Sequence, residues 1–145
     1  MRSEIARHRR IALDTSIFIY YFESNPRYVE LADCVFKWTE DPGNRAVTST
    51  LTMTEVLVGP YKAEDEQRAD ALFGLLSQYP HLEWIVPDLE IAEAAARIRG
   101  RHRLRTVDAL QAATAMHSGA TCLVGNDATF RRVAGLEILL LDDYV

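Results

Sequence analysis

Two kinds of hydrophobic pattern alternate along the chain. Short apolar runs predict buried strands at residues 10–14, 46–49, 82–86, 121–124 and 137–141. Apolar residues that recur every three or four positions predict helices at residues 17–22, 27–40, 51–58, 63–78, 89–100 and 107–117, with one further turn at 126–131. Strands that alternate with helices indicate βαβ units. We therefore predict a single α/β domain over residues 1–145, with a mostly parallel central sheet of about five strands flanked by helices.

Polar residues and prolines mark the expected helix ends. Asp14 closes the first strand and opens a helix, and Asp88 and Thr106 are suitable N-cap residues for two later helices. The Gly59-Pro60 pair predicts a helix end, because proline disrupts helical hydrogen bonding. Residues 1–9 precede the first strand, and we expect them to be flexible.

Length, composition and charge narrow the class of protein. The 145 residues are 48% hydrophobic, which fits one folded domain and argues against a disordered chain. The formal net charge of −5 argues, on average, against a nucleic-acid-binding protein. No apolar run approaches the roughly 20 residues of a membrane span, and no signal-peptide pattern follows the basic N-terminus. We therefore expect a cytoplasmic protein that does not contact membranes.

Cysteine and histidine do not predict a metal site. Cys34 and Cys122 lie in apolar segments far apart in the sequence, which predicts two buried thiols in a reducing compartment. The four histidines are scattered without the spacing of a zinc site. Any metal site would therefore be built from oxygen ligands.

Four acidic residues lie at or near the predicted carboxyl ends of strands or in helices: Asp14, Glu55, Asp108 and Asp127. Ligands of open parallel sheets bind at the carboxyl ends of the strands, so these acids can converge at one edge. Crowded carboxylates repel one another, and a divalent cation removes that conflict. Ligation by oxygen alone favours Mg²⁺ or Mn²⁺, ions that support hydrolysis of phosphodiesters.

Each acid also has a simpler interpretation. Asp14 and Asp108 can serve as helix caps. Asp127 can form a turn with Asn126, and Glu55 can be a solvated acid on a helix. These separate interpretations explain each residue, but they do not explain the joint arrangement.

Four motifs carry a resemblance to a known family: IALDTSIFIYYF at residues 11–22, TEVLVG at 54–59, TVDALQAATA at 106–115 and LVGNDATF at 123–130. Together they resemble the PIN-domain family, and in particular the toxin ribonucleases of the VapC type, over nearly the whole chain. The resemblance implies a PIN fold and a metal-dependent endoribonuclease that hydrolyses RNA by metal-activated water. It also implies that this enzyme is the toxin of a type II toxin–antitoxin module, with a cognate antitoxin protein and a homodimeric state.

The resemblance also assigns site residues. The residues that would hold Mg²⁺ or Mn²⁺ and form the catalytic site are Asp14, Glu55, Asp108 and Asp127. The residues that would support them or orient water are Ser16, Thr106 and Asn126. Ser16 and Asn126 can equally be local caps.

Two positions depart from the family pattern. Gly125 stands where a hydroxyl residue is usual, and Thr129 stands where many members carry a further acid. The first departure removes one contact to metal or substrate, and the second reduces the negative charge around a second ion. A one-ion and a two-ion site both remain open.

Arginines gather beside the predicted site despite the negative net charge. Residues 97–105 contain five arginines and no acid, and they run directly into the third motif. The residues that we expect to contact RNA phosphates or a partner are Arg101, Arg103, Arg105 and Arg131. A solvated helix end favoured by the helix dipole is the simpler interpretation, and an acidic partner protein is a third.

The aromatic residues between 17 and 38 admit two interpretations. Most of them are expected to be core residues, and any exposed ones would offer a groove for an antitoxin helix or a dimer face.

Two other functions compete with the ribonuclease. One is a catalytically silent PIN-fold module that binds RNA or a protein. The other is a phosphohydrolase with an aspartyl nucleophile, which usually has an Asp-x-Asp motif that Asp14 and Ser16 do not form. The RNA target, the cleavage site and the antitoxin's identity do not follow from the sequence.

Overall fold

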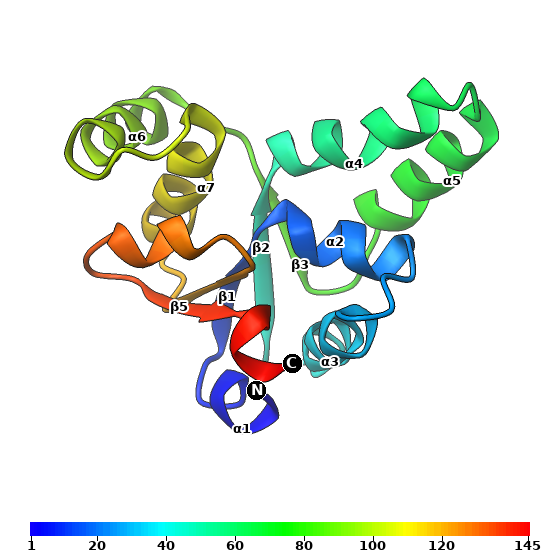
Figure 1. Cartoon of the computed structure of the whole chain (residues 1–145), viewed down its shortest axis with the longest axis horizontal. Coiled ribbons are helices and arrows are strands. Elements are labelled where there is room, and N and C mark those ends of the chain that lie inside the picture. The colour runs from blue at the N-terminus through cyan, green and yellow to red at the C-terminus, as the bar shows by residue number, and fades with distance from the viewer.

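Five parallel strands form the central layer of the computed structural model, which describes residues 1–145 (Figure 1). The strands are β1 (Arg10–Leu13), β2 (Arg45–Ser49), β3 (Leu82–Ile85), β4 (Cys122–Gly125) and β5 (Glu137–Leu140). Their order across the sheet is β3-β2-β1-β4-β5, and every neighbouring pair is parallel. The predicted α/β fold with a central parallel sheet is therefore confirmed.

The strand order reverses direction at β1. The chain places β2 and β3 on one side of β1 and then returns to place β4 and β5 on the other, so that Ile11 pairs with both Ala46 and Cys122. In open parallel sheets, such a reversal leaves a crevice at the carboxyl ends of the two strands that flank it. The topology therefore places a binding site where β1 and β4 end.

Helices cover both faces of the sheet. One face carries α1 (Arg2–Ile5), α2 (Thr15–Phe22), α3 (Val29–Thr39), α4 (Thr50–Lys62) and α5 (Glu66–Ser77). The other carries α6 (Leu89–His102), α7 (Thr106–His117) and the short 3₁₀ helix η1 (Ala128–Arg132). A second 3₁₀ helix, η2 (Leu141–Tyr144), follows β5. Figure 1 shows α6 and α7 on one side of the strands and α2 to α5 on the other.

Two hydrophobic cores lie on opposite faces of the sheet. Ile11 and Leu13 of β1 pack into the core that contains Phe18, whereas Ala12 packs into the core that contains Leu123 and Phe130. Successive side chains of a strand point to opposite faces, and both faces are covered here. This double burial explains why the sequence shows continuous apolar runs for its strands.

The N-terminal segment, which we expect to be flexible, contains a short helix. Residues 2–5 form α1, and the Ile5 side chain is only 2% exposed within the larger core. Burial of the Ile5 side chain holds the segment against the core. A single apolar residue among polar neighbours does not show this in the sequence.

Two expected helix ends are wrong. Helix α4 continues through Gly59 and Pro60 to Lys62, because proline has a helical φ angle and loses only one hydrogen bond near a helix end. Thr106 is the first residue of α7 and not its cap, since Arg105 occupies the N-cap position without a side-chain bond.

Other sequence predictions are confirmed. Cys34 and Cys122 are both buried free thiols. Phe18 and Phe36 are buried in the larger core, while the remaining aromatic residues of this region pack partly buried around it. None of the helices combines the length and the apolar character needed to cross a bilayer.

The docking of α1 can be tested with Ile5→Ala. We expect the free energy of unfolding to fall by about 2–4 kcal/mol, because a buried isoleucine is truncated. Leu89→Ala is the matched control, since Leu89 is 88% exposed and its truncation should change stability by under about 0.5 kcal/mol. Urea denaturation of both variants measures the difference, and equal effects would contradict the docking of α1.

Candidate metal centre

Asp14 lies at the carboxyl end of the central strand. It is the N-cap of α2, where its Oδ2 accepts hydrogen bonds from the backbone N–H of Ser16 (3.3 Å) and from the Ser16 hydroxyl (2.8 Å). The Asp14 amide continues the sheet by donating to the carbonyl of Val124 in β4 (2.9 Å). The cap interpretation of Asp14 is thus correct, and it also explains how Ser16 orients this carboxylate.

Burial gives Asp14 an unusual affinity for protons. Desolvation is the main cause that raises the pKa of Asp14 from 3.8 to about 6, and the bonds from Ser16 oppose it. The negative charges of Asp108 and Glu55 raise this pKa further. The charges of two acids from separate elements, Asp108 of α7 and Glu55 of α4, therefore act on Asp14 at the end of β1.

Glu55 of α4 is held by a threonine beside Asp14. The Thr15 hydroxyl donates to Glu55 Oε1 at 2.7 Å, and Thr15 is itself only 5% exposed. Glu55 is exposed, so its carboxylate reaches the site from the surface of α4. The contact fixes one oxygen of Glu55 next to the first turn of α2.

A buried polar network supports these acids. The Gln111 amide donates to the hydroxyls of Thr52 (2.8 Å) and Thr15 (3.3 Å). The Thr52 and Thr48 hydroxyls lie 2.9 Å apart, and Thr48 donates to the carbonyl of Leu13 (2.9 Å). These bonds join β1, β2, α2, α4 and α7, and they satisfy every polar side chain in the network.

The sequence analysis missed this network, although a signal was present. Thr15 follows Asp14 directly, Thr52 precedes Glu55 by three residues, and Gln111 follows Asp108 by three. Residues three apart on a helix share a face, so Thr52 and Gln111 point in the same general direction as the acids.

Asp108 lies in the first turn of α7 and is 6% exposed. Arg105 donates to it with two guanidinium nitrogens, from Nε to Oδ2 at 2.9 Å and from Nη2 to Oδ1 at 3.4 Å. The hydrogen bond to Asp108 is the main cause that raises the pKa of Arg105, and the charges of Asp127 and Glu55 add to the rise. Arg105 is thus the positive charge nearest the acids.

Asp127 and Asn126 follow β4, next to the end of β1. Asp127 caps η1 by accepting from the Thr129 amide (2.8 Å). The Asn126 side chain donates to the Tyr20 hydroxyl (3.3 Å) and accepts from the Asp142 amide (2.8 Å). The contacts of Asn126 therefore connect the site loop with α2 and η2.

Each acid has a local donor: Ser16 for Asp14, Thr15 for Glu55, Arg105 for Asp108 and the Thr129 amide for Asp127. No three of the His, Cys, Asp and Glu side chains lie close enough together to ligate one metal ion. The donor set still fits a hard divalent cation, because it contains only oxygen and a buried carboxylate under repulsion. Ligation would require Glu55 and Asp108 to exchange their present partners for the ion.

The two departures from the family pattern lie beside these acids. A Cβ at Gly125 would lie 3.0 Å from the Cβ of Asp14, so the glycine leaves room for the acid in its present position. The Thr129 hydroxyl is buried and has no hydrogen-bond partner. Both positions therefore shape the surroundings of Asp14 and Asp127.

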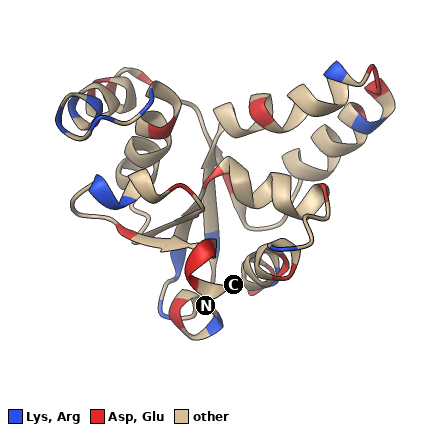
Figure 2. Cartoon of the chain, viewed as in Figure 1, with Lys and Arg blue, Asp and Glu red and all other residues tan.

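Basic residues surround one side of the acids. Figure 2 shows acidic segments in α4, in α7 and at the end of β1, with basic segments gathered in α6. A cavity of about 630 Å³ is lined by Arg99, Arg103 and Arg105 at the connection between α6 and α7. Arg131 instead pairs with Asp143. Thr106 and Arg101 are exposed.

The parallel sheet, its covering helices and the acids at its carboxyl edge define an α/β domain of PIN type. The sequence matches the family described as "PIN domain" over residues 11–136, and the chain belongs to the PIN-domain family. A search of curated proteins found no match.

Solved structures support the same fold. A toxin–antitoxin complex from Klebsiella pneumoniae is 24% identical, with 90% of this chain and 97% of that chain covered and a TM-score of 0.67. DNA-bound VapBC from Salmonella typhimurium is 23% identical, with coverages of 91% and 98% and a TM-score of 0.69. Mycobacterium tuberculosis VapC20 is 18% identical, with coverages of 88% and 97% and a TM-score of 0.69. At these identities, the likeness shows the fold alone.

The buried charge of Asp14 predicts a pH-dependent stability. Its pKa is higher in the folded state, about 6, than the ordinary value of 3.8, so the folded protein binds more protons between these values. The free energy of unfolding should therefore rise as the pH falls from about 7 to about 4. Asp14→Asn should be more stable than the parent protein by about 3 kcal/mol at neutral pH, and this difference should vanish near pH 4.

Urea denaturation in EDTA across this pH range measures the difference. Asp70→Asn, an exposed change on α5, is the control for the loss of one negative charge. A constant difference between Asp14→Asn and the parent protein at all pH values would contradict the raised pKa.

Proposed function

We propose that the protein is a Mg²⁺- or Mn²⁺-dependent endoribonuclease that acts as the toxin of a type II toxin–antitoxin module. The observation that carries the proposal is the buried carboxylate of Asp14, whose pKa is raised to about 6 mainly by desolvation and further by the charges of Asp108 and Glu55. Such an arrangement is costly in a protein unless a cation binds there. Hydrolysis of RNA phosphodiesters is the chemistry that an oxygen-ligated divalent ion best supports.

The relatives support this choice. Membership of the PIN-domain family covers most of the chain. Two of the similar structures are described as a toxin–antitoxin complex and as DNA-bound VapBC, and VapC20 is described as a toxin that cleaves the sarcin–ricin loop. We transfer the general class of these proteins, and not their particular targets.

The four acids would hold the ion directly or through water: Asp14, Glu55, Asp108 and Asp127. When bound, the ion supplies an activated water for attack on phosphorus and neutralises charge on the phosphodiester. Ser16 orients Asp14 through its hydroxyl, and Thr15 orients Glu55. The exposed guanidinium groups of Arg101 and Arg103 are available to bind RNA phosphates.

An antitoxin partner, a homodimer and a cytoplasmic location belong to the same proposal. The antitoxin rests on the described complexes of similar structures. The dimer is supported by apolar side chains that are exposed around the start of α6, with Val86 68% and Leu89 88% exposed.

A catalytically silent PIN-fold module that binds RNA or a protein is the alternative. The acids argue against it, because a binding module has no need for a buried Asp14 that the charges of Asp108 and Glu55 destabilise further. Cleavage and binding must therefore be measured separately.

Cleavage of total RNA by the purified protein is the direct test. We expect cleavage with Mg²⁺ or Mn²⁺ and none with EDTA. Asp14→Asn and Asp108→Asn should each reduce cleavage at least about 100-fold while RNA binding is retained, because each removes one ligand charge. Asp70→Asn, far along the chain on α5, should cleave as the parent protein does. Absence of metal-dependent cleavage in the parent protein would favour the silent module.

Arg105 should compete with the ion for Asp108. Both its Nε and Nη2 contact this carboxylate, so Arg105→Ala frees a ligand that the cation needs. We expect Arg105→Ala to bind Mn²⁺ about two- to fivefold more tightly in the absence of RNA, in keeping with the modest strength of an exposed ion pair. Calorimetric titration with Mn²⁺ measures this affinity.

Arg101→Ala is the matched control for Arg105→Ala. It removes the same charge from the last turn of α6, four residues before Arg105, and no acid pairs with Arg101. Equal affinities for Mn²⁺ in the two variants would show that net charge, and not the bond to Asp108, limits metal binding.

A further inference from the structure

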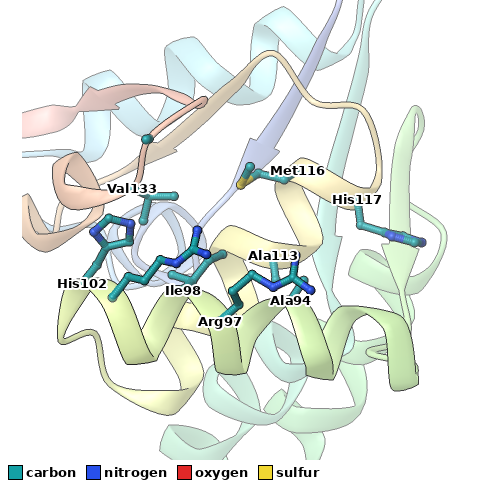
Figure 3. A pocket seen from close by; sticks show the side chains of 10 residues that line it. Ala94, Arg97, Ile98, His102, Ala113, Met116, His117 and Val133 are labelled. Carbon is teal, nitrogen blue, oxygen red and sulfur yellow. The ribbon is translucent and has the colours of Figure 1, made fainter.

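A second candidate binding site lies between α6, α7 and the segment after η1. It is a pocket of about 400 Å³, a size typical of small-ligand sites. Its apolar lining residues are Ala94, Ile98, Ala113, Met116, Val133 and Ala134. Figure 3 shows Ile98 and His102 along α6, with Met116 of α7 and Val133 near them. The proposed metal centre uses none of these side chains.

The two charged side chains that line this pocket, Arg97 and Arg101, are both positive. Arg97, Arg101, His102 and His117 line it, and no acid does. Arg97 pairs with Glu93 at 2.5 Å, and His117 lies 3.9 Å from Glu90. Arg101 is exposed and has no carboxylate partner, so one end of the pocket combines an apolar surface with a free guanidinium group.

The pocket is connected to the metal centre by a continuous basic segment. Arg101 and His102 line the pocket, Arg103 and Arg105 line the next cavity, and Arg105 contacts Asp108. The connection between α6 and α7 is fixed by the buried Leu104, whose carbonyl accepts from Arg99 (3.2 Å). Arg101 of the pocket therefore lies four residues before Arg105, the arginine that contacts Asp108.

We propose that this pocket receives one unpaired base of the RNA, while Arg101 and His102 bind the adjoining phosphate. Bases of single-stranded RNA stack on histidine rings and arginine planes without needing a particular sequence, and this pocket has both residue types in its lining. Arginine is well suited to bidentate phosphate contacts. The inference rests on the proposed ribonuclease function, because it names where the substrate is held outside the metal centre.

RNA explains the pocket better than an acidic peptide does. An acidic side chain would use the positive end of the pocket but leave the apolar lining uncovered. A nucleotide carries a flat base and a phosphate on one unit, which matches the apolar lining and Arg101 together.

Binding of a fluorescein-labelled, single-stranded RNA of random sequence tests the proposal, with EDTA present so that nothing is cleaved. Ala94→Leu fills the pocket without changing charge and keeps a good helix-forming residue. We expect it to weaken RNA binding about tenfold, as the loss of one base contact does. It should not weaken binding of an abasic ribose-phosphate oligomer of the same length.

Three further variants make the test specific. Arg101→Ala should weaken the binding of both oligomers about tenfold. Arg68→Ala, which removes an exposed arginine of α5, should change the binding of either oligomer little. Met116→Ala, at a side chain that is 44% exposed, removes part of the lining and should selectively weaken the base-containing RNA. The melting temperature of each variant checks that it is folded.

The outcomes separate this inference from the proposed function. Unchanged RNA binding by Ala94→Leu and Met116→Ala, or equal weakening of both oligomers, would overturn the base site. If these variants bind RNA normally but no longer bind a glutamate-rich peptide that the parent protein binds, the pocket is a site for a protein partner and the base site is overturned. If the pocket variants bind only the base-containing RNA more weakly, and the parent protein shows no metal-dependent cleavage, the base site stands and the nuclease function is rejected. If the parent protein cleaves RNA and the pocket variants bind RNA as the parent does, only the base site is rejected and the proposed function stands.

Discussion

Repulsion among carboxylates around the buried Asp14 is the constraint on which the site depends. A buried carboxylate is costly, and the charges of Asp108 and Glu55 increase the cost. The protein accommodates this by giving the acids separate donors, of which the Thr15 hydroxyl and the Arg105 guanidinium are the closest. The acids are therefore held near one another without ligating together. This arrangement suits a site that must exist before its cation binds.

The donors for the acids are themselves held in place. Gln111 and Thr52 bond to one another, and Gln111 also bonds to Thr15, which holds Glu55. Because the network is buried and each member has a partner, a change in one position would leave another polar group unsatisfied. The same bonds connect helices from both faces of the sheet, since Gln111 belongs to α7 and Thr52 to α4. The polar network thus joins the two halves of the domain directly beneath the acids.

The fold was largely predictable because buried positions recur with a regular spacing of apolar residues in the sequence. Apolar strands and helices with a repeat of three or four residues follow from which faces are covered. The gathering of Asp14, Asp108 and Glu55 was predictable because parallel strands present their carboxyl ends at one edge. Details set by single contacts were not predictable. The docking of Ile5 depends on a cavity that only the folded core defines, and Pro60 is tolerated because it lies near the end of α4.

The distribution of charge also required the structure. The arginines lie close to the site residues in the sequence, but only the side-chain contacts show which of them are paired with an acid. Arg105 pairs with Asp108 and Arg131 with Asp143, whereas Arg101 and Arg103 have no acidic partner. A net charge of −5 is compatible with RNA binding because these free groups lie together at one helix end. A phosphate backbone would meet positive charge there before it reached the acids, and a cation bound among those acids would reduce their repulsion toward it.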